Sequence, residues 1–449
     1  MDHTFTIYNF GCKVNQEEGG ALAALFIAAG WRYVPEDQPA ELVIVNTCTV
    51  TATADKKVRN LLRRLRREQP GCLLAACGCY AQRDPDALTA LGVDIVAGVD
   101  DRRRLLELVN AYQNGTHPIQ MVGEIANAHG FQTIVPRSRQ QRARAYLKVE
   151  DGCDQFCNYC IIPHVRGPVR SLPLDQAVEE ARLLLEAGHK ELVLTGIHIG
   201  AYGQDLPAGQ DLPHLLEALC ALPGLDRLRL GSVEPQQFTT ELLQTLAKLD
   251  KVCPHFHIPL QSGCEKTLAA MGRHYDPAAY GALLDRLRRL VGDPAFTTDV
   301  MVGYPGETEA DFLESQGFCQ SCGFAAMHVF PYSRRSGTPA AVAPDQVPQG
   351  VKADRAARLA ETAAAGSRAY RSRYRGKPLS MLVEERVDLA GKTYWKGHSE
   401  NYLLLYLPQE KIPVPIFPGS LVPVTGLDLL EDGLLAMAPV GPAPTGGAF

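Results

Sequence analysis

Apolar and polar positions alternate in a regular order along the first 125 residues. Amphipathic stretches that begin near Asn15 and Thr51 indicate helices. The apolar runs that indicate strands lie at 5–10, 41–46, 72–76 and 93–97. Strands that alternate with helices form a parallel sheet with helices on both faces, and such a sheet binds ligands beyond the carboxyl ends of its strands. The pattern therefore predicts an α/β domain over residues 1–125.

The strand and helix alternation continues through the middle of the chain. Six units are predicted, with strands near 145–152, 191–196, 227–233, 255–260, 297–303 and 325–330. Six parallel units make an incomplete barrel, and barrel proteins carry their sites on the loops that follow the strands. The Pro, Ala and Gly-rich stretch 337–352 predicts an extended connector, and a basic helix follows it.

After residue 378 the pattern changes to short β runs separated by turn signals. These runs lie at 380–386, 401–406, 421–424 and 434–438 and predict a small β-barrel. We therefore predict an α/β protein with three domains. The boundaries are 1–125 for the N-terminal domain, 126–144 for a basic linker, 145–376 for the partial barrel with the basic helix, 377–440 for the β-barrel and 441–449 for a tail.

Composition agrees with a folded chain of two or three domains. The 449 residues are 46% hydrophobic and 21% charged, which is ordinary for globular proteins. The amino terminus has no basic signal region, and the longest apolar stretch, near 20–31, is too short to span a bilayer. We expect a cytoplasmic protein with no membrane partner.

Positive charge is unevenly placed along a chain whose net charge is −5. One cluster without acidic residues comprises Arg137, Arg139, Arg142, Arg144 and Lys148. A second, between Arg368 and Lys377, adds Arg371, Arg373 and Arg375. A solvated linker and a solvated helix face explain them as well as a nucleic-acid surface does.

Three thiols follow the first predicted barrel strand in the spacing C-x3-C-x2-C: Cys153, Cys157 and Cys160. A four-iron cluster normally takes four thiolates, and no further cysteine occurs before Cys220, so one iron would stay open to a cofactor. Zinc is the alternative, but it prefers a closed set of four ligands that only His164 or a distant cysteine would complete. Thirteen cysteines, an odd number, favour ligands and free thiols over disulfides.

A second set of three cysteines follows the first three strands of the N-terminal domain. Cys12, Cys48 and Cys79 would meet at one edge of a parallel sheet, which suggests a second cluster with an open iron. Isolated cysteines are also frequently small buried apolar residues. Cys72 and Cys77 compete with Cys79, because period-two alternation puts Cys77 and Cys79 on the same side of a strand.

The blocks GCKVNQ, VNTCTVT, GCYAQR and DGCDQFCNYCIIPHVRGPVRS resemble the methylthiotransferases of the radical S-adenosylmethionine (SAM) superfamily over essentially the whole chain. The resemblance implies two [4Fe–4S] clusters and SAM as cofactors. Cys153, Cys157 and Cys160 would hold the cluster whose open iron binds SAM and cleaves it to a 5′-deoxyadenosyl radical. Cys12, Cys48 and Cys79 would hold an auxiliary cluster that carries the sulfur, and the GCYAQ block selects Cys79 over Cys77.

The resemblance also implies a SAM pocket, formed by Tyr159, Thr195, Gly196, Ser232, Glu234, Gln261, Val302 and Gly303. Thr195 and Gly196 would hold the amino group of SAM, Ser232 and Glu234 would lie near its ribose, and Val302 and Gly303 beside its adenine. Taken singly, each glycine is an ordinary turn residue. Cys264 departs from the small polar residue expected there and is treated as a bystander, and structural roles are favoured for the histidines.

The reaction implied is replacement of an aromatic C–H of a tRNA adenosine by a thiomethyl group. GCKVNQ and MGRHY look most like the branch that acts on N6-threonylcarbamoyladenosine beside the anticodon. GHSENYLLLYLP resembles the TRAM module, which implies contact with the tRNA anticodon stem-loop. An electron donor such as flavodoxin or ferredoxin is expected, and the sulfur source stays open. The alternatives are thiomethylation of isopentenyladenosine, thiomethylation of a ribosomal-protein aspartate, and a noncatalytic RNA-binding zinc protein.

Overall fold

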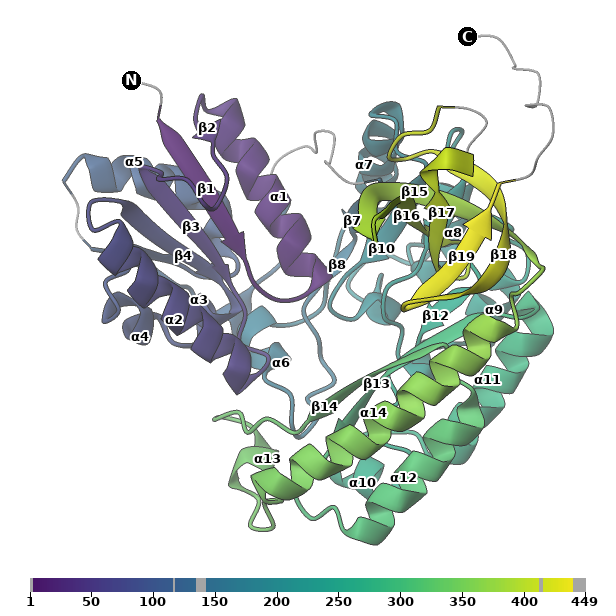
Figure 1. Cartoon of the computed structure of the whole chain (residues 1–449). Helices are drawn as coiled ribbons and strands as arrows, with labels where there is room; N and C mark the ends of the chain where they lie inside the picture. The colour runs from purple at the N-terminus through teal and green to yellow at the C-terminus, as the bar shows by residue number, and fades with distance from the viewer. Residues whose placement is uncertain (1–2, 116–117, 135–142, 412–414, 439–449) are drawn as a thin grey trace.

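The computed structural model describes residues 3–115, 118–134, 143–411 and 415–438 (Figure 1). Arg137, Arg139 and Arg142 of the predicted linker and the predicted tail at 441–449 lie outside these ranges. An N-terminal domain and a small C-terminal β-barrel lie on opposite sides of a central barrel (Figure 1). Within the described residues, no helix combines the length and apolar character needed to cross a membrane.

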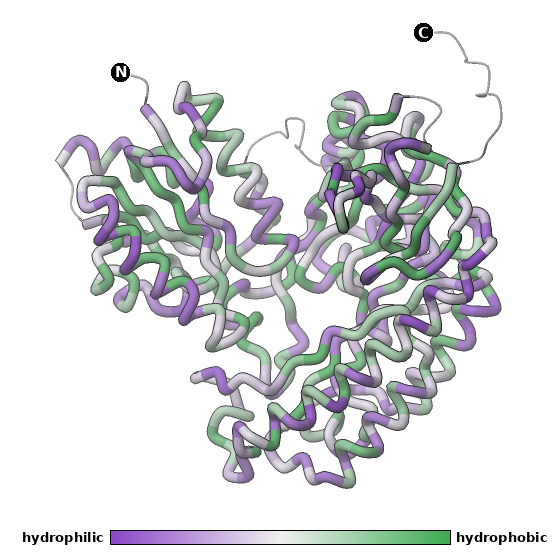
Figure 2. Tube along the Cα trace, in the orientation of Figure 1, coloured by the Kyte–Doolittle hydropathy of each residue, from purple (hydrophilic) through white to green (hydrophobic). Residues whose placement is uncertain are grey.

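The N-terminal domain is a six-stranded parallel sheet in the order β2-β1-β3-β4-β5-β6. Its strands are β1 (Thr4–Asn9), β2 (Arg32–Tyr33), β3 (Leu42–Thr47), β4 (Leu73–Gly78), β5 (Ile95–Ala97) and β6 (Ile119–Met121). Its helices are α1 (Lys13–Ala28), α2 (Ala52–Glu68), α3 (Cys79–Arg83), α4 (Pro85–Thr89) and α5 (Leu105–Gln113), with short 3-10 turns at Asp101–Arg104 and Ile125–Asn127. The strands are largely hydrophobic (Figure 2) and β3 is wholly buried, which confirms the predicted α/β domain. β2 and β6 are too short to leave a pattern in the sequence.

The central domain is the predicted incomplete barrel of six parallel strands. One half contains β7 (Ala145–Lys148), β10 (Glu191–Thr195) and β11 (Arg227–Arg229), and the other contains β12 (His255–His257), β13 (Ala295–Val302) and β14 (Ala326–Pro331). Single bridges, including Ser232 with His257, join the halves. The helices are α6 (Ile162–Arg166), α7 (Leu174–Glu186), α8 (Leu212–Cys220), α9 (Thr240–Leu246), α10 (Glu265–Ala270), α11 (Pro277–Val291) and α12 (Glu309–Cys322), and β8 (Glu150–Asp151) pairs with β9 (Arg170–Ser171).

The predicted extended connector at 337–352 is wrong in part. It contains the short helix α13 (Pro339–Val342), and the long helix α14 (Gln349–Ser372) begins inside it. Both helices start directly at or after a proline, because proline is tolerated in the first helical turn and its fixed backbone angle suits a helix start. The prolines that indicated extended chain therefore mark helix starts.

The C-terminal unit is a closed barrel in the order β15-β16-β17-β19-β18. Its strands are β15 (Pro378–Leu389), β16 (Lys392–Ser399), β17 (Leu404–Pro408), β18 (Leu421–Leu430) and β19 (Gly433–Met437). The predicted β-barrel is confirmed, but β16 is absent from the prediction. The hairpin turn before it is only Ala390-Gly391, and two of the three buried positions of β16, Gly397 and Ser399, give no apolar signal.

The second basic cluster mainly fastens the C-terminal barrel to the rest of the chain. α14 ends at Ser372, so Arg373 and Arg375 lie beyond the helix and not on its face as predicted. Arg373 is paired with Asp293, and Arg375 is paired with Asp428 on β18. Arg371 donates hydrogen bonds to backbone carbonyls at the turn between β18 and β19.

We expect Gly397→Ala to destabilise the C-terminal barrel by about 1–3 kcal/mol, the usual cost of forcing atoms into a packed interior. An added Cβ would lie 2.0 Å from the carbonyl oxygen of Leu382 on β15. Urea unfolding followed by fluorescence of Trp395, in a Trp31→Phe background, reports on this barrel because the chain has two tryptophans. Gly317→Ala is the control, since its Cβ meets nothing within 4 Å. An unchanged urea midpoint for Gly397→Ala would contradict this packing.

Candidate metal centres

Cys153, Cys157 and Cys160 lie together in the loop that leaves β8, at the carboxyl end of the first barrel strand. The backbone N–H of Cys153 donates to the carbonyl of Gly167 at 3.0 Å, and the N–H of Cys160 donates to the carbonyl of Cys157 at 2.9 Å. Burial, followed by the neighbouring thiols, raises the pKa of Cys153 to about 12. A thiol that holds its proton this firmly becomes a thiolate when a metal displaces the proton.

Cys12, Cys48 and Cys79 follow β1, β3 and β4, three adjacent strands of the N-terminal sheet. The thiols are close neighbours: burial, then Cys79, and also Cys12, raise the pKa of Cys48 to about 12. Gly11 allows the close approach, because a Cβ there would lie 2.9 Å from the Cys48 sulfur. Cys12 is exposed, whereas Cys48 and Cys79 are buried.

Cys77 does not join this group. It lies inside β4, is fully buried in the core of the sheet, and its sulfur is 3.8 Å from Oδ1 of Asn46. The strand ends at Gly78, whose φ of 91° turns the chain into α3, so the period-two alternation that equated Cys77 with Cys79 stops between them. Cys72 precedes the first residue of β4, at the opposite end of that strand.

Among the described residues, neither triad has all three sulfurs within 4.8 Å of one another. Zinc holds thiolates at about 2.3 Å in a tetrahedron, which draws the sulfurs to within about 4 Å of one another. Among the residues that the structure describes, one group of three potential ligands gathers within 4.8 Å, and it is Asp211, His214 and Glu241. That group is explained by capping, because Asp211 accepts a hydrogen bond from the His214 backbone at the start of α8. Wider spacing suits a four-iron cluster, in which each thiolate binds a different iron.

Several unpaired polar atoms lie at the carboxyl ends of the barrel strands, as the cysteines of the first triad do. In the described part of the chain, Oε1 of Glu150, both ring nitrogens of His198 and Oε1 of Gln261 are buried without a hydrogen-bond partner. Burial raises the pKa of Glu150 well above its usual value. Gln261 has a left-handed backbone with φ of 63°. Buried polar groups are normally satisfied, so these fit a polar ligand with amino, carboxylate or hydroxyl groups.

The other pocket residues implied by the resemblance also lie at strand ends. Thr195 ends β10, Ser232 and Glu234 follow β11, and Val302 ends β13. Tyr159 packs against the apolar cluster of Met271, Met301, Tyr304 and Tyr332. Gly196 adjoins Glu150, since an added Cβ would lie 2.6 Å from its Oε2. Packing explains the glycine at position 303, because an added Cβ would lie 2.4 Å from Cγ of Lys352 on α14.

Arg166, the last residue of α6, connects the two triads. Its Nε donates to the sulfur of Cys79 at 3.2 Å, and its Nη1 donates to Glu18 on α1 at 2.8 Å. Arg166 is fully buried, and α6 begins two residues after Cys160. A five-residue helix spans about 7 Å, so α6 places the second triad close to the first.

The charges around Arg166 form a buried network across the two domains. Burial raises the pKa of Glu18, but Arg102, Arg166 and Lys148 outweigh it and hold the pKa at about 2. Asp151 is paired with Lys148 at 2.7 Å and with Arg166 at 3.2 Å. A further contact between the two domains lies near Cys48 in the sequence. Arg335 of the barrel domain donates hydrogen bonds to Thr49 at 3.0 Å and to Asp55 at 2.6 Å.

A second buried arginine, Arg273, contacts the first triad. Arg273 donates from Nη1 to the sulfur of Cys157 at 3.3 Å and forms an ion pair with Glu234. Sequence reasoning missed Arg166, Arg273 and Glu150. Their motifs, IIPHVRG, MGRHY and KVED, were visible, but nothing in the sequence indicates that these charges are buried against thiols.

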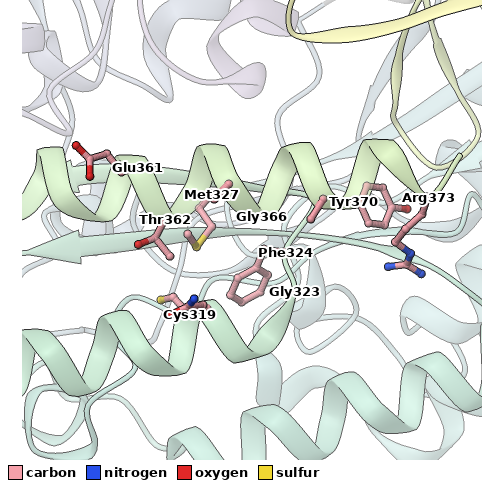
Figure 3. Close-up of a pocket in the computed structure, with 12 residues that line it drawn as sticks. Cys319, Gly323, Phe324, Met327, Glu361, Thr362, Gly366, Tyr370 and Arg373 are labelled. Carbon is pink, nitrogen blue, oxygen red and sulfur yellow. The ribbon is translucent and has the colours of Figure 1, made fainter. Parts of the chain in front are cut away.

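One pocket of about 550 Å³ lies away from these cysteines, between α12 and α14 (Figure 3). Met327 of β14 lines it, together with Phe324, Tyr370 and Arg373. His328, the next residue of β14, faces the opposite side of the strand and pairs with Asp299 of β13 at 3.7 Å. The sheet therefore separates this pocket from the barrel interior.

Comparison with known proteins gives matches over both metal-centre domains. Residues 4–98 match the model of Uncharacterized protein family UPF0004, and residues 147–319 match that of the Radical SAM superfamily. A Threonylcarbamoyladenosine tRNA methylthiotransferase MtaB from Bacillus subtilis is 38% identical over 402 residues, 89% of each chain. One of the same name from Thermotoga maritima is 37% identical over 89% of this chain and 90% of its own. A tRNA-2-methylthio-N(6)-dimethylallyladenosine synthase from Pelotomaculum thermopropionicum is 32% identical over 94% of each.

Among solved structures, the radical S-adenosylmethionine methyltransferase TsrM from Kitasatospora setae matches with a TM-score of 0.57 at 15% identity. The match covers 76% of this chain and 77% of that chain, and it shows a shared fold. The sequence matches go further, because they span nearly the full length of both partners at well over 30% identity. Each cysteine triad lies inside one of the two matched regions. The chain belongs to the methylthiotransferase family of the radical SAM superfamily.

Proposed function

We propose that this protein is a tRNA methylthiotransferase that converts the C2–H of N6-threonylcarbamoyladenosine, beside the anticodon, to C2–SCH3. The proposal is based on the two cysteine triads, one from each domain. They lie close together because α6 follows Cys160 and its last residue, Arg166, contacts Cys79. The choice of nucleoside is based on the relatives. Those named for threonylcarbamoyladenosine are 34–38% identical to this chain, and those named for dimethylallyladenosine are 32–33% identical.

Family membership implies SAM and [4Fe–4S] clusters as cofactors. We assign Cys153, Cys157 and Cys160 to the cluster that binds SAM, and Cys12, Cys48 and Cys79 to the auxiliary cluster. Three thiolates leave one iron of such a cluster open. When bound, these groups supply the one-electron cleavage of SAM and the sulfur transfer that no protein side chain can perform.

The protein's own residues bind, orient and shield the reactants. Glu150, His198 and Gln261 offer unpaired polar atoms to the amino-acid and ribose parts of SAM. The apolar cluster around Tyr159 keeps water from one wall of the site. The network around Arg166 fixes the two domains against each other, and such fixed geometry lowers the entropy cost of bringing reacting groups together.

The C-terminal barrel is the proposed tRNA-binding module. Arg386 on β15 is exposed and lies 5.5 Å above the ring of Trp395 on β16, an arrangement on which RNA bases can stack. The arginines after α14 are engaged in ion pairs, so the barrel surface is the better RNA contact. The target base must leave its stack to reach the cysteines. A tRNA substrate implies a cytoplasmic enzyme, and cluster reduction implies an electron donor such as flavodoxin or ferredoxin.

Cys79→Ala should reduce the iron content of anaerobically purified protein from about eight to about four irons per chain, because the auxiliary cluster loses a ligand. Cys77→Ala is the matched control and should keep both clusters, since Cys77 packs within the sheet. Iron and sulfide analysis gives the result. Equal iron loss in the two variants would contradict the choice of Cys79.

Cys157→Ala should abolish SAM cleavage, whereas Cys48→Ala should keep cleavage and lose sulfur insertion. The two thiols belong to different triads, so removing one leaves the other cluster in place. The measurement is 5′-deoxyadenosine formation beside thiomethylated product, both by mass spectrometry. Equal loss of cleavage in both variants would remove this division of roles.

Purified, reconstituted enzyme should thiomethylate tRNA that carries threonylcarbamoyladenosine at least tenfold faster than tRNA that carries isopentenyladenosine. Nucleoside mass spectrometry of a deletion strain gives the matching result, a loss of the 2-methylthio form of threonylcarbamoyladenosine alone. A strain that keeps this nucleoside and loses a thiomethylated ribosomal peptide would refute the proposal. White protein with zinc and no iron after anaerobic purification would refute it as well.

A further inference from the structure

Each cysteine triad has one thiol in contact with a buried arginine. Nε of Arg166 donates to the sulfur of Cys79 at 3.2 Å, and Nη1 of Arg273 donates to the sulfur of Cys157 at 3.3 Å. Arg166 is fully buried, and the side chain of Arg273 is 3% exposed. The two arginines come from different parts of the barrel, one from α6 and one from the turn after α10.

Each arginine is also held in place by acidic or polar partners. Nη1 and Nη2 of Arg166 bind Glu18, Asp151 and Asn15. Arg273 is paired with Glu234, and its guanidinium lies 5.0 Å above the ring of Tyr275. A guanidinium is planar and always charged, so these contacts fix both the position of the charge and the direction of the N–H toward sulfur.

Within the described part of the chain, the side-chain ion pairs around Arg166 contain more cations than carboxylates. These pairs join four cations to two carboxylates: Arg102, Lys148, Arg166 and Arg170 with Glu18 and Asp151. All six side chains are at most 5% exposed. Buried excess charge is costly unless an opposite charge compensates it. Cys79 lies at the edge of this set, and a cluster bound through thiolates is an anion that would compensate it.

Hydrogen bonds to the sulfurs and net local charge are among the main factors that set the reduction potential of an iron–sulfur cluster. Reduction adds a negative charge to the cluster. A nearby cation and an N–H donated to sulfur therefore stabilise the reduced form more than the oxidised form, and they raise the potential.

We propose that Arg166 and Arg273 are positioning residues that raise the reduction potentials of the two clusters separately, Arg166 acting on the auxiliary cluster through Cys79 and Arg273 on the SAM-binding cluster through Cys157. The inference rests on the cluster ligands assigned under the proposed function. The two clusters would lie close together, and each would have its own arginine. The reduction potential of each cluster could therefore be set independently of the other. Arg166 would then have a role beyond holding the two domains together.

Arg166→Met is a usable variant, because three cations remain for Glu18 and Asp151 and no carboxylate loses all its partners. Arg166→Lys keeps the positive charge and removes the planar N–H contact. Arg273→Met is the matched variant at the other triad. Thermal unfolding of the iron-free proteins checks that each variant folds.

The test is an EPR-monitored redox titration of reconstituted full-length protein. The clusters are read one at a time, in a chain with alanine at Cys153, Cys157 and Cys160 and in a chain with alanine at Cys12, Cys48 and Cys79. Arg166→Met should lower the midpoint potential of the auxiliary cluster and leave that of the SAM-binding cluster unchanged. Arg166→Lys should cause a smaller shift, and Arg273→Met should show the reverse selectivity.

Other outcomes are equally decisive. Loss of auxiliary iron in Arg166→Met with retention in Arg166→Lys would support the proposal, because the cation would then be needed to hold the anionic cluster. Unchanged potentials in folded methionine variants, iron loss in both Arg166 variants, or equal shifts of both clusters by one substitution would overturn it. Failure of the unaltered chain to take up iron at either triad would instead overturn the proposed function.

Discussion

Buried charge at the junction of the N-terminal domain and the barrel is the constraint on which the rest of the structure depends. Glu18 of α1 is 1% exposed and finds its cations partly on the barrel, in Lys148 and Arg166. Asp151 of the barrel in turn lies 3.6 Å from Arg102 of the N-terminal domain. Separating the two domains would leave these buried charges without their partners, and breaking a buried ion pair costs about 3–5 kcal/mol of stability.

This junction also fixes how the two cysteine triads lie relative to each other. Arg166 ends the helix that follows Cys160 and touches Cys79, so the same residue that closes the interface also sets the distance between the triads. Burial lowers the pKa of Lys13, next to Cys12, and the barrel charges that act on it include Arg229 on β11 and Asp299 on β13. The triad of the N-terminal domain therefore lies at this junction, where Arg166 of the barrel domain contacts Cys79.

Much of this arrangement could be predicted from the sequence, because the cysteines follow strands and parallel strands end at one edge. The spacing of Cys153, Cys157 and Cys160 and the three separate thiols of the N-terminal domain were enough to identify the two candidate centres. Alternation alone left Cys77 and Cys79 equivalent, since the turn at Gly78 depends on a backbone angle that the sequence pattern does not contain.

The sequence did not reveal the ion pairs between distant residues, the strand β16 or the helix starts at prolines. Arg166 and Glu18 are 148 residues apart, and nothing in the local pattern indicates that either is buried. β16 was missed because its inward positions include glycine and serine. α13 was missed, and the start of the predicted basic helix, α14, was placed too late, because proline at a helix start resembles proline in extended chain. The buried charges and β16 depend on tertiary packing, which overrides local preference, whereas the prolines are ambiguous in the local sequence itself.

Iron anomalous diffraction from crystals of the anaerobically reconstituted protein would locate both clusters. We expect two separate four-iron peaks, one bounded by the sulfurs of Cys153, Cys157 and Cys160 and the other by those of Cys12, Cys48 and Cys79, with the Arg166 side chain between them. A single peak, or a second peak at Cys77 or elsewhere than this junction, would contradict the two proposed sites.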